Sequence, residues 1–181
     1  MLLIARIYSK YRKILSFFMP IKSIFMVFDR YEASILEVLQ RDGRVTNQAL
    51  AEQVGLSPAP CWRRLKALEE NCVIRGYAAL LDPEKIGIGL CVFAHVTITR
   101  HNQEVVEQFE EAVTNHPEIL ECYSTMGSSD YLLKVMVKDM ATYDAFLHDT
   151  LFVLPGIRGI ESFAALREIK YQTALPLENN Q

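Results

Sequence analysis

Three cationic side chains follow two closely spaced prolines in the segment LSPAPCWRRLKALEE, residues 56–70. No acid separates Arg63, Arg64 and Lys66 from one another, and the acids of the segment come only at its far end. Guanidinium and ammonium groups donate hydrogen bonds to phosphate oxygens and to base edges. The residue types therefore point to nucleic-acid recognition, although the formal net charge of the chain is −3.

The spacing within this segment predicts a helix that begins at its prolines. Ser57 is a favoured N-cap residue, and Pro58 takes the first helical position, where its missing N–H costs nothing. Pro60 still lies in the first turn and removes only an N–H that has no partner inside a helix. The expected apolar stripe comprises Cys61, Leu65 and Leu68, and the opposite stripe comprises Ala59, Arg63 and Lys66. Such a helix suits entry into the major groove with its N-terminus first.

The residues before this segment decide between a solvated face and a binding face. An isolated amphipathic helix most often carries its cations as a solvated face. Here apolar residues recur at helical spacing from Asp29 and stop at Gly43, which can serve as a C-cap. Thr46 or Asn47 then caps a short helix that Gly55 closes. Helix, short helix, turn and third helix are the order of a helix-turn-helix.

After Asn71 the pattern changes from helices to strands. A short strand, a proline turn and a glycine-bounded connector come first, up to about residue 89. The pattern then predicts strand, helix, strand, strand, helix and strand at 90–99, 103–117, 118–126, 131–138, 140–154 and 157–169. This order is the ferredoxin-like βαββαβ fold. The expected fold class is α+β, with an N-terminal winged helix-turn-helix domain and a C-terminal ferredoxin-like domain.

Two expectations concern what the second domain buries. The helix at 140–154 is expected to turn five side chains inward: Met140, Tyr143, Phe146, Leu147 and Leu151. Because the helices of this fold cover one face of the sheet, the other face is expected to bear Phe93 and Val135. That face is too apolar to remain in water, so we expect a second subunit to cover it.

The composition is that of a folded protein, with 50% hydrophobic and 23% charged residues. The four cysteines form no C-x-x-C pair and have no histidines at zinc-ligand spacing, so we expect buried thiols in a reducing cytosol and no metal site. Residues 1–25 carry five cations and no acid, and their uncharged run is shorter than the ~20 residues that a membrane span needs. We expect synthesis to begin at Met26. The alternative is that residues 1–25 form a basic arm that binds membranes or DNA weakly.

Four segments together are specific to one family. A helix-turn-helix with LSPAPCWRRLKALE, followed by IRGYAALLDPEKIG, GSSDYLLKVMVKDMATYDAFL and LPGI, resembles the Lrp/AsnC family of leucine-responsive and asparagine-responsive transcription regulators over residues 27–177. The resemblance implies a DNA-binding domain at 26–89 and a ligand-sensing and oligomerisation domain at 90–177. A basic extension at 1–25 and a short tail at 178–181 flank them.

The resemblance also implies partners. It implies a cytoplasmic, nucleoid-associated regulator that binds double-stranded DNA, needs no cofactor and binds no membrane. Its homodimers are expected to assemble into octamers or larger particles, and its small-molecule effector is expected to be an amino acid.

Two sets of functional residues follow from the resemblance. The candidate DNA-binding residues are Asn47, Gln48, Ser57, Pro58, Ala59, Pro60, Trp62, Arg63, Arg64 and Lys66. The candidate effector-binding residues are Gly127, Ser128, Ser129, Asp130 and Tyr131. Gly127 permits close backbone approach, and Asp130 can pair with an α-ammonium group. Ser128 replaces the acid that many relatives carry there, and a plain hairpin turn explains the same residues.

Trp62 lies on the flank of the predicted recognition helix. A tryptophan in this position more often packs at a domain edge than stacks on a base. Its place among the DNA-binding candidates therefore depends on whether its ring reaches the surface.

Three other functions fit parts of the sequence. Sirohaem decarboxylases resemble the family in both domains, so a tetrapyrrole enzyme is one alternative. Such a site gathers histidines, whereas the four histidines here are scattered: His95, His101, His116 and His148. An effector-independent architectural DNA-binding protein is the second alternative, and a stand-alone sensing module is the third. Since no catalytic or phosphate-loop motif occurs and the helix-turn-helix is intact, we expect a regulator and no enzyme.

Overall fold

The chain folds into two compact units. The computed structural model describes residues 27–99 and 103–177. Of these, residues 27–78 and 173–177 form the first unit, and residues 79–99 and 103–172 form the second. Each unit has its own hydrophobic cluster. The extension at 1–25 and the tail at 178–181 lie outside the described residues.

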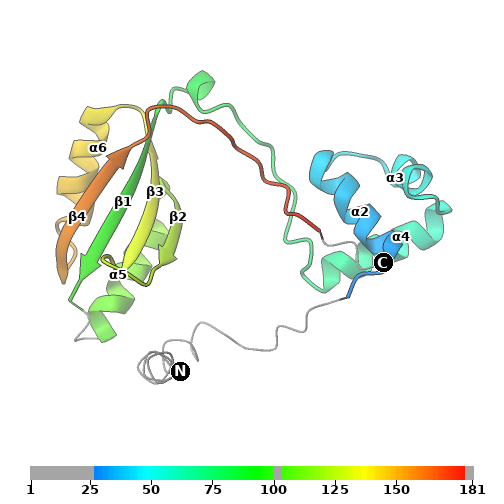
Figure 1. Ribbon diagram of the computed structural model, residues 1–181, viewed down its shortest axis with the longest axis horizontal. Coiled ribbons are helices and arrows are strands. Elements are labelled where there is room, and N and C mark those ends of the chain that lie inside the picture. The colour runs from blue at the N-terminus through cyan, green and yellow to red at the C-terminus, as the bar shows by residue number, and fades with distance from the viewer. Residues whose placement is uncertain (1–26, 100–102, 178–181) are drawn as a thin grey trace. The chain divides into compact units, whose positions relative to one another are not determined.

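Three helices form the first unit (Figure 1). They are α2 (Arg30–Arg41), α3 (Asn47–Val54) and α4 (Pro58–Glu70). The helices enclose a small apolar cluster of buried residues: Ile35, Leu36, Leu50, Ala51, Cys61 and Leu68. Because Cys61 and Leu68 come from α4, that helix buries the predicted stripe and leaves the opposite stripe in solvent.

Local capping residues set the ends of α3. Thr46, rather than Asn47, is its N-cap, and the Thr46 hydroxyl accepts the backbone N–H of Ala49 at 3.2 Å. Gly55 ends the helix in the left-handed region, at φ 72°, which glycine adopts without steric cost. The prediction that Gly55 closes this helix is therefore confirmed.

Gly43 packs against an aromatic ring and does not cap α2, so the predicted C-cap is wrong. The helix ends at Arg41 with Asp42 as an extended C-cap. A β-carbon at Gly43 would lie 3.3 Å from the ring of Tyr77. The Tyr77 hydroxyl donates to the Glu69 carboxylate at 2.8 Å, and burial together with that carboxylate raises the pKa of Tyr77 to about 12. Gly43 therefore leaves space for the Tyr77 ring, whose hydroxyl stays protonated and is hydrogen-bonded to Glu69 near the end of α4.

The short strand expected after Asn71 does not form. The residues between α4 and the 3-10 turn η1 (Glu84–Ile86) contain no strand. Val73 and Ile74 instead pack against the apolar cluster of the first unit. A strand needs a hydrogen-bonding partner, and no segment among the described residues of this unit supplies one. The described part of the unit is therefore helical, without a β-wing.

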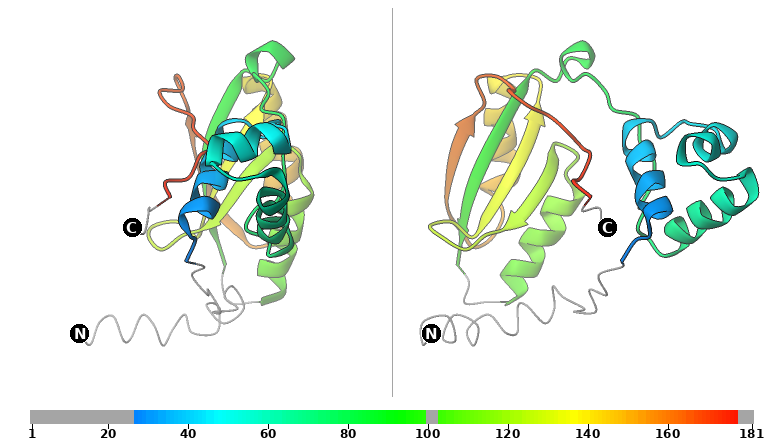
Figure 2. Two further views of the ribbon diagram at one scale, coloured as in Figure 1. Left: turned by 90° about the vertical axis from the view of Figure 1, so that its right-hand side faces the viewer. Right: turned by 45° about the vertical axis from the view of Figure 1, so that its right-hand side comes forward.

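The second unit is a four-stranded antiparallel sheet with two helices on one face (Figure 2). The strands pair in the order β2-β3-β1-β4, so the predicted ferredoxin-like βαββαβ fold is confirmed. Its elements are β1 (Leu90–Ile98), α5 (Gln103–Asn115), β2 (Ile119–Ser124), β3 (Tyr131–Val137), α6 (Met140–Phe146), the π-turn η2 (Leu147–Leu151) and β4 (Ile157–Ala164).

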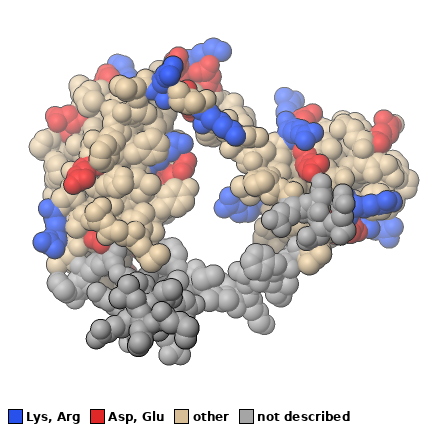
Figure 3. All heavy atoms as spheres, viewed as in Figure 1, with Lys and Arg blue, Asp and Glu red and all other residues tan. Residues whose placement is uncertain are grey.

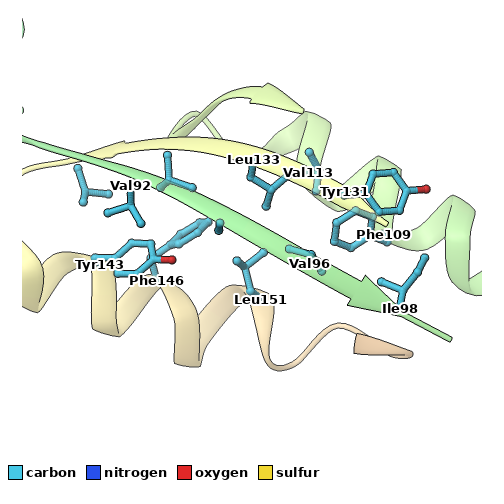
Figure 4. Packing of buried hydrophobic residues seen from close by; sticks show 13 residues of the cluster. Val92, Val96, Ile98, Phe109, Val113, Tyr131, Leu133, Tyr143, Phe146 and Leu151 are labelled. Carbon is cyan, nitrogen blue, oxygen red and sulfur yellow. The ribbon is translucent and has the colours of Figure 1, made fainter. Parts of the chain in front are cut away.

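Both helices pack on the face formed by alternate residues of β1 and β3 (Figure 4). Phe109 of α5 lies against Tyr131 of β3, with ring centroids 4.7 Å apart. Leu151, at the end of η2, is fully buried beneath β1. Of the five residues predicted to turn inward from 140–154, Tyr143, Phe146 and Leu151 therefore form one continuous core with α5 and the sheet.

Two positions in this unit differ from the prediction. Val135 pairs with Val92 across β3 and β1 and is fully buried on the helix-covered face, so it is not on the open face. Met140 is the first residue of α6 and is 57% exposed, because the inward stripe begins one turn later at Tyr143. Phe93 does lie on the open face, as predicted, and it is a cross-strand neighbour of Phe163.

The end of the described chain packs on the first unit. Gln40 of α2 and Leu175 exchange two hydrogen bonds: Gln40 Nε2 donates to the Leu175 carbonyl at 3.2 Å, and the Leu175 N–H donates to Gln40 Oε1 at 2.6 Å. Leu177 packs against the apolar cluster of the same unit. The structure therefore places residues 173–177, which the sequence assigned to the second domain, with the helices of the first.

We expect Gln40→Ala to lower the free energy of unfolding of the first unit by about 1 kcal/mol, because both hydrogen bonds to Leu175 are lost. Gln48→Ala is the matched control, since the Gln48 side chain is exposed and bonds only to Glu52 in its own helix. Urea unfolding followed by the fluorescence of Trp62, the single tryptophan, measures both variants. Equal losses in the two variants would contradict a stabilising role of residues 173–177.

Candidate nucleic-acid interface and effector turn

The outward stripe of α4 carries two of the predicted cations. Arg63 is exposed and forms no ion pair with another described residue. The Lys66 ammonium lies 5.1 Å from the centroid of the Trp62 ring and 3.6 Å from the Glu70 carboxylate. Trp62 is 51% exposed, so it does not pack into the domain edge. Two cations and one aromatic ring thus share the solvent face of this helix.

Arg64 points toward α2 instead. Its guanidinium pairs with the Asp29 carboxylate, lies 3.7 Å from Glu32 and stands 5.5 Å from the centroid of the Tyr31 ring. These partners belong to the start of α2, so the contact fastens α4 to that helix. The charge of Arg64 is therefore balanced within the unit, unlike that of Arg63.

Asp29 caps α2 and is the main partner of Arg64. Its carboxylate accepts the N–H groups of Tyr31 and Glu32, at 2.9 Å each, and its own N–H donates to the Glu32 carboxylate. The Glu32 N–H, together with the Arg64 guanidinium, lowers the pKa of the Asp29 carboxyl below its ordinary value of 3.8. The carboxylate therefore stabilises the folded unit above the unfolded-state pKa, and this contribution is lost as the pH falls through the folded-state pKa.

We expect Asp29→Ala to lower the free energy of unfolding of the first unit by about 1 kcal/mol at neutral pH, as removal of an N-cap side chain usually does. Asp29→Asn keeps a capping oxygen without the charge, so it is expected to lose less and to flatten the decline in stability as the pH falls below about 4. Urea unfolding at neutral pH measures the first effect, and urea unfolding at several pH values below about 4 measures the second. An unaltered acid decline in the Asn variant would exclude Asp29 as its source.

Asn47 joins the start of α3 to the first turn of α4. Its Nδ2 donates to the Pro58 carbonyl at 3.1 Å, and the side chain is half-buried. Gln48, the next candidate, is exposed and donates to Glu52 at 3.3 Å. Of the two candidates from α3, one therefore positions α4 and the other faces solvent.

Ser57 occupies the predicted N-cap position of α4, but its hydroxyl makes no capping hydrogen bond. A capping hydroxyl accepts the N–H of the second or third helical residue, and the third residue here is Pro60, which has none. Ser57, Pro58 and Ala59 are exposed, and Pro60 is half-buried. The first turn of α4 therefore presents these residues to solvent.

Cationic and acidic side chains lie side by side on the visible face of the first unit (Figure 3). The chain as a whole has a formal net charge of −3. Attraction to phosphates must therefore come from a local surface such as the outward stripe of α4, and not from the overall charge.

The first part of the predicted effector turn, between β2 and β3, is divided between solvent and interior. Gly127, at φ 154°, and Ser128 are exposed. Ser129 is buried, and its hydroxyl lies 3.1 Å from Nδ1 of His95 on β1. The His95 ring in turn meets the Phe163 ring edge-on, with centroids 5.3 Å apart. His95 was not predicted among the residues of the effector turn, although the alternation of β1 places it on the same face as Phe93.

The second part of the turn is built into the sheet. The Asp130 carboxylate accepts the N–H of Ile98 at 2.8 Å, and the Asp130 N–H donates to the Val96 carbonyl at 2.9 Å. Tyr131 is buried against α5, and its hydroxyl donates to Glu110 at 2.8 Å. Within the candidate set, Gly127 and Ser128 therefore offer the most accessible surface.

Comparison with known proteins decides the family. The family model of winged helix-turn-helix DNA-binding domains matches residues 28–75, and that of the Lrp/AsnC ligand binding domain matches residues 91–175. The chain is 41% identical over 152 residues to DecR, a DNA-binding transcriptional activator of Escherichia coli K12, and the match covers 84% of this chain and 100% of DecR. The chain belongs to the Lrp/AsnC family.

Other Lrp/AsnC proteins match over a similar length. The leucine-responsive regulatory protein of Escherichia coli K12 is 41% identical over 150 residues, which are 83% of this chain and 92% of that protein. The structure of regulator NMB0573 of Neisseria meningitidis with L-Met has a TM-score of 0.81 and 43% identity, covering 84% of this chain and 98% of that one. The structure of an AsnC family regulator of Agrobacterium tumefaciens has a TM-score of 0.80 and 42% identity, and the match covers 85% of this chain and 100% of that one. This chain is thus a DNA-binding transcription regulator.

The three described histidines of this Lrp/AsnC chain do not gather in one place. His95 lies on β1, His116 lies beyond the end of α5, and His148 lies in η2, while His101 lies outside the described residues. No three histidine, cysteine or acidic side chains of the described ranges are grouped so that they could hold a metal ion. Among those same residues, no helix has the length and apolar character that a membrane crossing requires.

Proposed function

We propose that α4 of this Lrp/AsnC regulator enters the major groove of double-stranded DNA, and that an amino acid or a related metabolite bound at the 127–131 turn modulates this binding. The observation that carries the proposal is the likeness to NMB0573, a regulator 43% identical to this chain whose structure holds L-Met. The protein is expected to act in the cytoplasm, on the nucleoid.

The geometry of α4 supports the DNA-binding part of the proposal. Arg63 and Lys66 lie on a face that no other described part of the first unit covers, and both can reach phosphates or base edges. Arg64 and Asn47 take part differently, because their contacts with Asp29 and Pro58 hold α4 in place. The proposed division is therefore between residues that contact DNA and residues that position the contacting helix.

The effector part of the proposal depends on the exposed half of the turn. Gly127 has no side chain, so the main chain of an amino acid can approach the backbone there. Ser128 is a neutral hydrogen-bonding neighbour, and Asp130 is committed at least in part to the Ile98 N–H. We therefore expect Gly127 and Ser128 to contact the ligand, with Asp130 shaping the turn.

Thermal-shift screening of the twenty amino acids and their keto acids tests the effector part. A ligand that binds only the folded protein raises the melting temperature, and a concentration 100 times the dissociation constant adds about 2.7 kcal/mol of stability. Ser128→Arg should abolish the shift by filling the exposed site, and Ser128→Ala should largely keep it. If no compound shifts the melting temperature, the regulator is effector-independent or responds to another metabolite.

The open sheet face supports an oligomer. Phe93 and Phe163 are cross-strand neighbours there and are 38% and 55% exposed. An apolar pair of this kind is typically covered by a second subunit. We propose homodimers that assemble further, and light scattering on the full chain at micromolar concentration should give at least twice the monomer mass. A monomer mass would contradict this part.

A further inference from the structure

The first turn of α4 has almost no backbone donors. A helix normally presents free N–H groups at its start, and these bind phosphates or acceptor atoms. Here Pro58 and Pro60 supply none, and the Cys61 N–H already bonds to the Ser57 carbonyl at 3.2 Å. Within this turn only the Ala59 N–H remains without an intrahelical partner. The leading end of α4 is therefore unsuited to binding phosphate through its backbone.

The same end of α4 is apolar at its surface. Pro58 and Ala59 are exposed, and Trp62 follows within one turn with half of its surface in solvent. Lys66 stands over the Trp62 ring, at 5.1 Å from the centroid, and so favours one placement of the indole along the helix. Apart from the Ser57 hydroxyl and the indole N–H of Trp62, the surface that would meet base edges first is therefore apolar, with cations one turn behind it.

Base pairs offer one apolar group in the major groove, the 5-methyl group of thymine. We propose that Pro58, Ala59 and Trp62 form a contact surface for thymine methyl groups, and that this contact sets part of the sequence specificity of the regulator. The inference rests on the proposed placement of α4 in the major groove. The inference adds that the first turn of α4 selects thymine through apolar contact. A first turn rich in hydrogen-bond donors would instead bind guanine or the phosphate backbone.

Removal of the methyl groups tests this contact directly. A duplex is first enriched from a random-sequence pool by the full chain, and its protected half-sites are then synthesised with deoxyuridine in place of thymidine. Each buried methyl group should be worth about fourfold in affinity. With one buried methyl group in each of two half-sites, we therefore expect the deoxyuridine duplex to bind about 16-fold more weakly in a gel-shift titration at fixed salt. It should also quench the fluorescence of Trp62 less at saturation.

Variants assign the effect to α4. Trp62→Ala should bind the two duplexes with nearly equal affinity, and Trp62→Gln, which keeps a long side chain, should do the same. Arg63→Ala should weaken both duplexes and keep the ratio between them, because its contact does not involve the methyl group.

The outcomes separate the two proposals. Equal affinity of the wild-type chain for both duplexes would overturn the thymine contact and leave the placement of α4 intact. If both Trp62 variants keep the wild-type ratio between the affinities for the two duplexes, the methyl groups do not contact Trp62, and this assignment is overturned. Failure to enrich any duplex would overturn the placement of α4 in the groove, and this inference with it.

Discussion

Replacing Arg63 and Lys66 together by alanine is expected to lower the affinity for an enriched specific duplex by about 100-fold, roughly tenfold for each cation. Both side chains lie on the exposed stripe of α4, and neither is tied to another helix as Arg64 is. The fold should persist, since among the described residues the ion pair lost is the exposed one between Lys66 and Glu70, which contributes a few tenths of a kcal/mol. A gel-shift titration at fixed salt measures the effect.

A second double variant controls for the change in net charge. Lys85→Ala with Arg167→Ala removes the same two positive charges from exposed positions of the second unit. It should change the affinity by less than about threefold, because only the surface facing the groove feels the phosphates strongly. Similar losses in the two double variants would show that net charge, and not α4, is responsible.

The salt dependence distinguishes two kinds of contact. If both cations of α4 contact phosphates, the slope of log K against log salt should become shallower by about 2 in the Arg63 and Lys66 variant. If they contact base edges, the affinity should fall while the slope changes less. Measuring the titration at three salt concentrations therefore tells whether these residues position the helix or read the sequence.

Gly156→Ala is expected to lower the free energy of unfolding of the second unit by about 3 kcal/mol, the sum of backbone strain and overpacking. Gly156 has φ 83°, and a β-carbon there would lie 2.1 Å from Cγ1 of Val105 on α5. A valine side chain is stiff at χ1 and cannot simply turn away. The same glycine accepts the Thr99 N–H at 2.7 Å, so a shift of its backbone would also disturb the end of β1.

Gly87→Ala separates the two contributions. Gly87 has nearly the same dihedral angle, φ 79°, but a β-carbon there would meet nothing within 4 Å. Its alanine variant should therefore lose only about 1 kcal/mol, the cost of the left-handed backbone. Urea unfolding is followed both by far-ultraviolet circular dichroism, which reports on both units, and by Trp62 fluorescence, which reports on the first unit alone. A loss of stability seen by circular dichroism and not by fluorescence therefore belongs to the second unit.

Truncating Val105 completes the test. In the Val105→Ala background the Gly156 substitution should cost about 1–2 kcal/mol less than in the wild-type chain, because the clashing methyl groups are gone. Additive losses would contradict a steric origin, and a loss at Gly156 no larger than at Gly87 would contradict both parts of the argument.

Sequence patterns located the helices of the first unit well, because their signals are local. Thr46 and Gly55 act within one turn of the helix that they bound, and the stripe of α4 repeats within thirteen residues. The partner of Arg64 was not predictable, since Asp29 lies 35 residues earlier and only the packing of two helices brings them together. Nor could a pattern reveal that the strand after Asn71 has no partner.

The second unit shows the same limit for strands. β3 has apolar residues on both faces and a single lysine, Lys134, marks its open face, so the pattern is weak and Val135 was assigned to the wrong face. For the effector turn, the residue types are evident from the sequence, but it could not predict which side chains form hydrogen bonds within the sheet and which remain accessible. Ser129 and Asp130 bond to β1, a strand more than 30 residues away, and this leaves Gly127 and Ser128 as the accessible part.

The hydrogen bonds between Gln40 and Leu175 have a consequence for how the protein is made. The two residues are 135 positions apart, so a ribosome must add the whole second unit after Gln40 before this contact can form. At about 5–20 residues per second, that interval lasts roughly 7–27 s. The three helices of the first unit are synthesised before the second unit, but the first unit is complete only when Leu175 has been added. A nascent chain released before Leu175 would have all three helices of that unit but not the segment that covers the end of α2.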